Sequence, residues 1–251
     1  MDKYLQKAID AGLIDVIEDW LKTEKYVSIS SIQRNFSVGY DTACAIFYYL
    51  IEEKLIEDKP TYKRGHKVIG YDQPFPMEVY LLDYNPEITK ALRKEFNCYS
   101  DIHVITDDFK HFMDTHNDIE CIVSPANSFG YMDGGYDRAI TDYFGKCAQE
   151  EVQKYLDENF FGEQPIVTSI IVDIPNTNKK LIHTPTMRLP SPIKDETIVY
   201  HCMRSTLICA IHNKVHSIVI PAYGGLTGGV RPNIIAKCMK AAYEQILEHI
   251  K

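Results

Sequence analysis

The chain has 251 residues, a formal net charge of −8 and a hydrophobic content of 45%, which is typical of a globular protein with one large or two ordinary domains. It contains no run of about 18 apolar residues, so we expect no transmembrane helix and no membrane partner. Its start, Met1–Leu5, lacks a basic stretch followed by an apolar core, which predicts a cytoplasmic protein without a secretory signal. The 7 cysteines include no Cys-x-x-Cys pair, so reduced thiols and no metal site are expected.

Residues 1 to about 58 have the apolar spacing of helices. A short helix over 30–35, a turn at Val38–Tyr40 and a longer helix capped by Asp41 form a predicted helix-turn-helix. The segment 59–69 then reads as a β-hairpin, or wing. Its basic residues are the candidates for phosphate contact: Lys59, Lys63, Arg64 and Lys67.

The order Ser-x-x-Gln-Arg-x-Phe-x-Val-Gly-Tyr-x-x-Ala runs from Ser30 to Ala43. With this motif, residues 3–70 resemble the C-terminal gamma domain of FtsK-type DNA translocases, a winged helix. In that family polar and basic residues after the Gly-Tyr read DNA, whereas Asp41 and Thr42 stand there in this chain. Since an acidic side chain repels phosphates, DNA contact and protein docking or dimerisation both stay open for this region.

Pro74–Pro76 lies in a predicted linker, 71–77, between a domain at 1–70 and a second at 78–251. Beyond the linker strands and helices alternate, which predicts a three-layer α/β/α fold with a mixed sheet. The expected strands are 79–83, 103–106, 121–123, 166–172, 180–183 and 217–220. The expected helices are 86–96, 136–145, 147–158, 196–213 and 232–250.

Two of these strands open onto glycine-bearing loops that lead into helices. We call them the first glycine loop (residues 124–135) and the second glycine loop (residues 221–230). A helix N-terminus offers free N–H groups and a favourable dipole to an anion, and Gly134–Gly135 leaves the backbone open to close approach. Two such loops can hold one diphosphate from opposite sides.

Four segments in order, Thr106–Phe109, Ser124–Ile140, Leu181–Pro190 and Pro221–Val230, resemble those of macrodomains, the fold that binds ADP-ribose. The resemblance covers residues 79–250 and is closest to bacterial and phage macrodomain proteins. Ser124 stands where that family has the first Asn of Asn-x-x-Asn, the glycine run shrinks to Asp133–Gly135, and the second loop is one residue longer.

The resemblance implies a role for each matching residue. Asp108 would accept a hydrogen bond from the adenine amino group, with Phe109 beside the base, although Asp108 can instead be a helix N-cap, for which Asp107 is equally suited. Asn127 would orient the distal ribose, and Asp137 would assist a water in hydrolysis. Asp137 stands near a helix N-terminus, whose dipole favours the ionised form, although it can equally be a helix cap. The remaining expected ligand contacts are Ser128, Gly134, Gly135, Tyr136, Tyr223, Gly225, Thr227, Gly228, Gly229 and Val230.

Three functions fit these features. The first is an ADP-ribosyl hydrolase acting on a macromolecule, which the pair Asn127 and Asp137 favours. The second is a non-catalytic sensor of ADP-ribose or a related NAD-derived nucleotide. The third is a DNA-binding adaptor with a degenerate macrodomain. The ligand in the first two is ADP-ribose, and no cofactor is expected.

Overall fold

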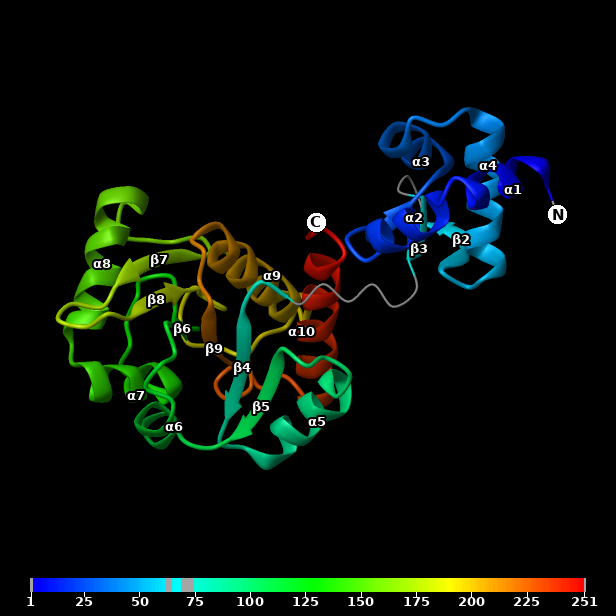
Figure 1. Ribbon diagram of the computed structural model, residues 1–251. Helices are drawn as coiled ribbons and strands as arrows, with labels where there is room; N and C mark the ends of the chain where they lie inside the picture. The colour runs from blue at the N-terminus through cyan, green and yellow to red at the C-terminus, as the bar shows by residue number, and fades with distance from the viewer. Residues whose placement is uncertain (1, 62–64, 69–74, 251) are drawn as a thin grey trace. The chain divides into compact units, whose positions relative to one another are not determined.

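The computed structural model in Figure 1 describes residues 2–61, 65–68 and 75–250. The chain folds into two compact units, and the boundary between them falls between residues 73 and 74, within the segment that we expected to be a linker. Each unit has a hydrophobic core of its own. No helix in the described part of the chain is long and apolar enough to cross a bilayer.

The first unit packs four helices against a small antiparallel sheet of strand order β1-β3-β2. The capping box of Ser28 and Ser31 begins the third helix, and Ile17, Ile32 and Leu50 are fully buried in the core. The elements are α1 (Lys3–Asp10), α2 (Leu13–Leu21), β1 (Tyr26–Val27), α3 (Ile29–Phe36), α4 (Tyr40–Glu52), β2 (Ile56–Thr61) and β3 (Gly65–Val68).

The turn between α3 and α4 corrects one prediction. Gly39, and not Asp41, is the N-cap of α4, and Asp41 lies within its first turn, where a negative charge still suits the helix dipole. Ser37 ends α3 in the left-handed conformation. On the hairpin, Lys59 and Lys67 are exposed, while Lys63 and Arg64 lie outside the described residues.

The second unit is built on a six-stranded sheet of order β5-β4-β9-β6-β8-β7. All neighbouring pairs are parallel except β7 and β8, so the predicted mixed sheet is confirmed. The strand expected from residue 166 begins only at 170, because Val167 has a φ of 61° that no extended strand accommodates. The strands are β4 (Glu78–Asp83), β5 (Ile102–Thr106), β6 (Cys121–Ser124), β7 (Ile170–Asp173), β8 (Lys180–His183) and β9 (Ser217–Pro221).

Helices cover both faces of this sheet (Figure 1). Successive residues of β4 point to opposite faces, so Leu81 packs with α5 (Pro86–Phe96), α9 (Thr197–His212) and α10 (Pro232–Leu247). Leu82 packs with α6 (Phe109–Thr115), α7 (Gly135–Phe144) and α8 (Cys147–Phe160). The α/β/α layers are therefore as predicted, although α6 was not among the expected helices.

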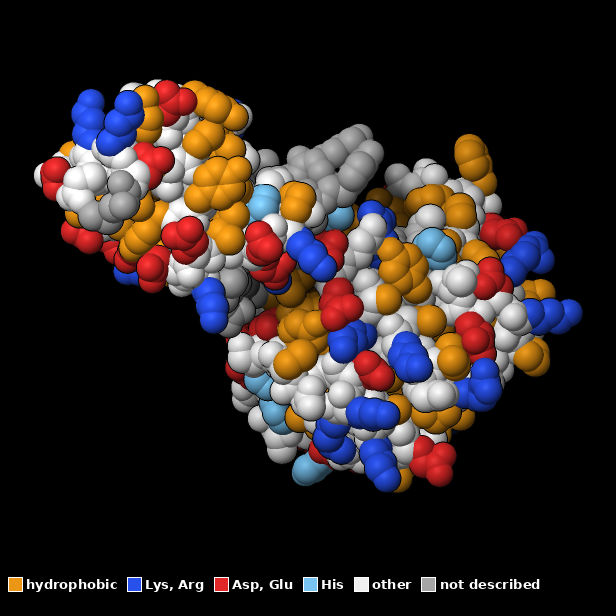
Figure 2. All heavy atoms as spheres, turned by 90° about the vertical axis from the view of Figure 1, so that its right-hand side faces the viewer, with side chains coloured by type: hydrophobic (Ala, Val, Ile, Leu, Met, Phe, Trp, Pro, Cys, Tyr) orange, Lys and Arg blue, Asp and Glu red, His pale blue; other side chains and the backbone are white. Residues whose placement is uncertain are grey.

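Charge is unevenly distributed over the second unit. Figure 2 shows lysine and arginine side chains gathered on the face of this unit that carries α5 and α10. Exposed basic residues of these helices are Lys90, Arg93, Lys94 and Lys237. Basic side chains are thus present on this face although the chain as a whole has a net charge of −8, and acidic side chains lie among them.

Candidate functional site

A cleft of about 370 Å³ lies at the carboxyl ends of the parallel strands. Segments that follow β4, β5, β6, β8 and β9 all line it. In open α/β sheets this edge is where ligands bind, because the loops that leave parallel strands meet there. The sheet order places the second glycine loop, after β9, between the segments after β4 and those after β6.

The two glycine loops meet in this cleft. Gly135 begins α7 with a φ of 55°, and a Cβ added there would lie only 2.9 Å from Cδ2 of Leu226 in the second loop. The left-handed backbone conformation favours glycine at this position, and the contact with the end of the Leu226 side chain shows how closely the two loops approach. Gly134, Gly225, Thr227 and Gly228 also line the cleft.

The second glycine loop folds back on itself. The N–H of Val230 donates to the carbonyl oxygen of Gly224 at 3.0 Å, and a Cβ added to Gly228 would lie 2.8 Å from that same oxygen. The amide N–H groups of Leu226, Thr227 and Gly228 donate to no group in the described part of the chain. Three successive unused donors beside a cleft form a site for an anion.

The N-terminus of α7 adds donors from the other side. Gly134 is its N-cap, with no side-chain cap. The N–H groups of Gly135 and Tyr136 donate to no group among the described residues, as is usual for the first turn of a helix. The cleft thus has backbone donors on both of the loops that the sequence singled out.

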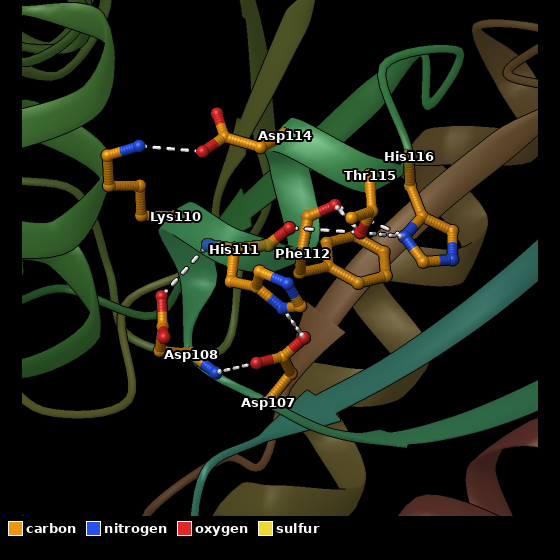
Figure 3. A network of polar contacts seen from close by, with 8 residues as sticks. All are labelled: Asp107, Asp108, Lys110, His111, Phe112, Asp114, Thr115 and His116. Carbon is orange, nitrogen blue, oxygen red and sulfur yellow. Dashed lines mark hydrogen bonds and ion pairs between the residues drawn. The ribbon is translucent and has the colours of Figure 1, made fainter.

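Two aspartates stand together at the start of α6, and the structure separates their roles (Figure 3). Asp107 is fully engaged, since it accepts from the N–H of Asp108 and lies 2.5 Å from Nδ1 of His111. This contact lowers the pKa of Asp107 and raises that of His111. Asp108 caps α6 by accepting from the N–H of His111 at 2.9 Å, and its second oxygen makes no hydrogen bond within the described chain.

An aromatic pair forms part of the cleft next to these aspartates. The ring of Phe109 is buried and meets the ring of Tyr136 edge-on, with centroids 5.2 Å apart. The hydroxyl of Tyr136 is buried and has no hydrogen-bond partner among the described residues. Burial raises the pKa of Tyr136 far above its usual value, so the hydroxyl keeps its proton. A buried hydroxyl without a partner at a cleft marks a position for a ligand or water.

The side chain of Asn127 stabilises the first glycine loop, to which it belongs. Its Nδ2 donates to the carbonyl oxygen of Tyr131 at 3.0 Å, and its Oδ1 accepts from the N–H of Phe129 at 3.0 Å. Asn127 also forms an isolated bridge with Met187, which follows β8. The side chain lines the cleft, but its hydrogen bonds already serve to fix the loop.

Asp137 is paired with Ser124 at the end of β6. The Ser124 hydroxyl donates to Oδ1 of Asp137 at 2.7 Å, and Ser124 itself is fully buried. The pKa of Asp137 is raised from 3.8 to about 7, mainly by burial; the Ser124 hydrogen bond opposes this rise and the charge of Asp133 adds to it. This corrects the expectation that the helix dipole keeps Asp137 ionised, because desolvation outweighs it.

The structure does not bring four of the expected ligand contacts to the cleft lining. The Tyr223 ring is wholly buried, and its hydroxyl lies 2.6 Å from that of Thr206. Ser128 is buried as well, and its N–H donates to Met187 at 3.1 Å. Gly229 is exposed but lies outside the lining, and Val230 is buried in the core.

Other lining residues were missed from the sequence. Asp83 and Tyr84 follow β4 into the cleft, and the Tyr84 ring is 65% exposed. Thr186 and Met187 enter after β8. Because Asp83 ends the strand expected at 79–83, the sequence could have suggested it as a site residue. Only the sheet order shows that this strand lies beside β9.

All charged residues that line the cleft are acidic: Asp83, Asp107, Asp108, Asp133 and Asp137. The two nearby arginines point to other partners. Arg188 pairs with Glu163 at 2.6 Å, and Arg138 lies 3.6 Å from Asp142 on the exposed side of α7. An anion in this cleft must therefore be held by backbone N–H groups.

Comparison with known proteins places this chain in context. Residues 123–239 match the family model of the Macro domain. An uncharacterized protein from Aquifex aeolicus is 30% identical over 126 residues, which make up 50% of this chain and 73% of that protein. The family model begins after β5, so it does not include Asp83 or Asp108.

Solved structures of macrodomains also match the chain. One from Oceanobacillus iheyensis with MES bound is 23% identical, covering 53% of this chain and 72% of that one, with a TM-score of 0.46. The macrodomain of Mycobacterium tuberculosis DarG is 18% identical over 51% and 84%, with a TM-score of 0.44. The Trypanosoma brucei macrodomain in complex with ADP is 15% identical over 72% and 65%, with a TM-score of 0.46.

Substitution of Gly228 tests the tight fold of the second loop. Gly228→Ala places a Cβ against the backbone of Gly224, so we expect a loss of about 1–3 kcal/mol in the free energy of unfolding. The matched control is Gly134→Ala, whose Cβ would meet no atom within 4 Å; its effect should stay within about 0.5 kcal/mol. Urea denaturation of the full chain measures both, and equal effects would contradict the loop geometry.

The buried carboxyl of Asp137 predicts a pH-dependent stability. Its pKa is raised on folding, so its contribution is complete below about pH 4 and is lost as the pH rises through about 7. The free energy of unfolding of the wild type minus that of Asp137→Asn should therefore fall over this range, by at most about 4 kcal/mol. Taking this difference cancels the opposite effect of His183, whose pKa burial lowers to about 4.

The control for this measurement is Asp142→Asn, which removes an exposed carboxylate of the same helix. Urea denaturation at a series of pH values gives the comparison. A difference for Asp137→Asn that stays constant with pH would show that its carboxyl titrates normally.

Proposed function

Since this chain belongs to the Macro domain family, we propose that its cleft binds ADP-ribose and releases it from a modified macromolecule. The observation that carries the proposal is the set of unused N–H groups on both glycine loops. They surround a space that no cationic side chain of the described residues lines, as expected of a site that holds a diphosphate through its backbone.

The sheet order gives the ligand a direction. The second glycine loop lies in the middle, so the diphosphate belongs there, and one end of the ligand reaches the segments after β4 and β5. At that end the second carboxylate oxygen of Asp108 accepts a hydrogen bond from the amino group of adenine. The exposed ring of Tyr84 and the edge of Phe109 provide apolar surface for the base.

The distal ribose then lies beside the first glycine loop, near Asn127 and Asp137. In hydrolysis Asp137 takes a proton from a water whose oxygen bonds to the anomeric carbon. The bond from that carbon to the acceptor breaks, the acceptor takes a proton from solvent, and Asp137 then releases its proton to solvent. A pKa of about 7 suits a general base at neutral pH, and Ser124 holds the carboxylate by its hydrogen bond.

One observation favours a sensor without catalysis as the second candidate. The side chain of Asn127 is already hydrogen-bonded to the backbone of Phe129 and Tyr131, which leaves it less able to orient a ribose. In that case the cleft binds ADP-ribose or a related nucleotide, and the signal passes to the first unit.

For the first unit we propose a winged helix that docks on DNA or on a protein. The helices α3 and α4, joined by a short turn, followed by the hairpin of β2 and β3 support this arrangement. Exposed Lys59 and Lys67 favour a polyanion, whereas Asp41 and the exposed rings of Tyr40 and Tyr48 on α4 favour a protein.

Calorimetry with ADP-ribose tests the binding. We expect a Kd in the micromolar range, which corresponds to about −8 kcal/mol, and a weaker interaction for Gly228→Ala because the loop no longer presents its amides. If no heat of binding is detected at millimolar ADP-ribose, both the hydrolase hypothesis and the sensor hypothesis are wrong.

Release of ADP-ribose from modified protein or DNA separates the two candidates. Asp137→Asn should slow release by about 10²–10⁴-fold while ADP-ribose still binds. The wild-type rate should rise with pH through about 7, because only the ionised carboxylate accepts a proton. If Asp137→Asn releases ADP-ribose at the wild-type rate, Asp137 is not a catalytic residue. If the wild type binds ADP-ribose but releases none from modified protein or DNA, the sensor hypothesis is favoured.

A gel shift with duplex DNA tests the first unit. If the wing contacts phosphates, Lys59→Glu with Lys67→Glu should weaken binding, and the slope of log K against log salt should fall by about 2. Lys22→Glu is the control, since Lys22 is already paired with Asp19. A DNA affinity that changes neither with salt nor with these substitutions would favour docking on a protein.

A further inference from the structure

The acidic residues of the cleft form two groups, separated by the second glycine loop. Asp83 ends β4, Asp107 and Asp108 follow β5, and Asp133 and Asp137 belong to the segment after β6. Since β9 lies between β4 and β6, the unused amides occupy the centre and carboxylates occupy both ends. This pattern matches a ligand that is anionic in the middle and rich in donors or positive charge at its ends.

The end of the cleft beside the first glycine loop carries an aspartate, Asp133, that forms no ion pair with the described residues. Asp133 is exposed, lines the cleft and directly precedes the N-cap of α7. It is near enough to Asp137 to raise the pKa of that carboxyl, and Arg138 is turned toward Asp142 instead. Neither carboxylate therefore has a cationic partner among the described residues.

An independent feature shows that the cleft is built for a ligand. The Tyr136 hydroxyl, on the same turn of α7, is buried without a hydrogen-bond partner among the described residues, and such groups are rare unless something binds to them. The cleft is thus polar and incomplete, and Asp133 makes its end after β6 negatively charged.

We propose that the natural ligand carries a cationic nitrogen group on its distal ribose, facing Asp133. This inference rests on the proposed binding of ADP-ribose in the same cleft. Two sources offer such a group: the nicotinamide ring of NAD⁺, and the guanidinium of an ADP-ribosylated arginine. In either ligand the positive group offsets the repulsion between the Asp133 carboxylate and the diphosphate. An anionic acceptor beside the ribose is disfavoured by the same charge.

Matched ligands test the charge directly, using calorimetry on the full chain. NAD⁺ and NADH differ at the ring by one positive charge, and peptides ADP-ribosylated on arginine or on serine form a second pair. We expect at least one cationic ligand to bind about tenfold more tightly than its neutral counterpart, with a preference that shrinks as salt rises. Preference in the first pair identifies a nicotinamide, and preference in the second identifies a guanidinium.

Substitutions assign the preference to its residue. Asp133→Asn should reduce this preference to near unity, whereas Asp142→Asn, outside the cleft lining, should leave both the preference and the affinity for ADP-ribose unchanged. Binding of ADP-ribose with equal affinities within both pairs overturns this proposal alone. Absence of ADP-ribose binding at millimolar concentration overturns the proposed function, and this inference with it.

Discussion

The cleft depends on the parallel pairing of β9 between β4 and β6. This pairing puts the second glycine loop at the centre of the carboxyl edge and brings Leu226 against Gly135 of the first loop. Because Gly228 has no side chain, its backbone can lie directly on that of Gly224, and the loop turns its amides outward. The two acidic groups of the cleft lie on either side of this loop, because β9 lies between β4 and β6.

A site built from backbone donors has a physical consequence for its side chains. Fixed N–H groups hold an anion without a lysine or arginine, so the cleft can place carboxylates where a ligand presents donors. One of them, Asp137, is buried enough to hold its proton up to about neutral pH. The Ser124 hydroxyl moderates this effect through one hydrogen bond.

Much of the fold was predictable because its signals are local. Asn85 caps α5 by accepting from the N–H of Glu87 at 2.9 Å, with Pro86 in the first turn, as its sequence indicated. The site was predictable in part. Asp108, Asn127, Asp137 and most of the glycines line the cleft, but Tyr223 belongs to the core and Tyr84 was missed. Both tyrosines follow strands, so local spacing cannot tell a ring that turns inward from one that turns outward.

The sequence by itself determined the alternation of strands and helices, the two glycine loops and the residues available at the ends of the strands. These properties depend on neighbours along the chain, such as caps, apolar spacing and the absence of a Cβ. Only the tertiary structure decided which strand lies beside which, which side chains face the cleft and how strongly Asp137 holds its proton. The reason is that sheet order and burial arise from contacts between residues far apart in sequence, and a pKa follows from the burial that those contacts create.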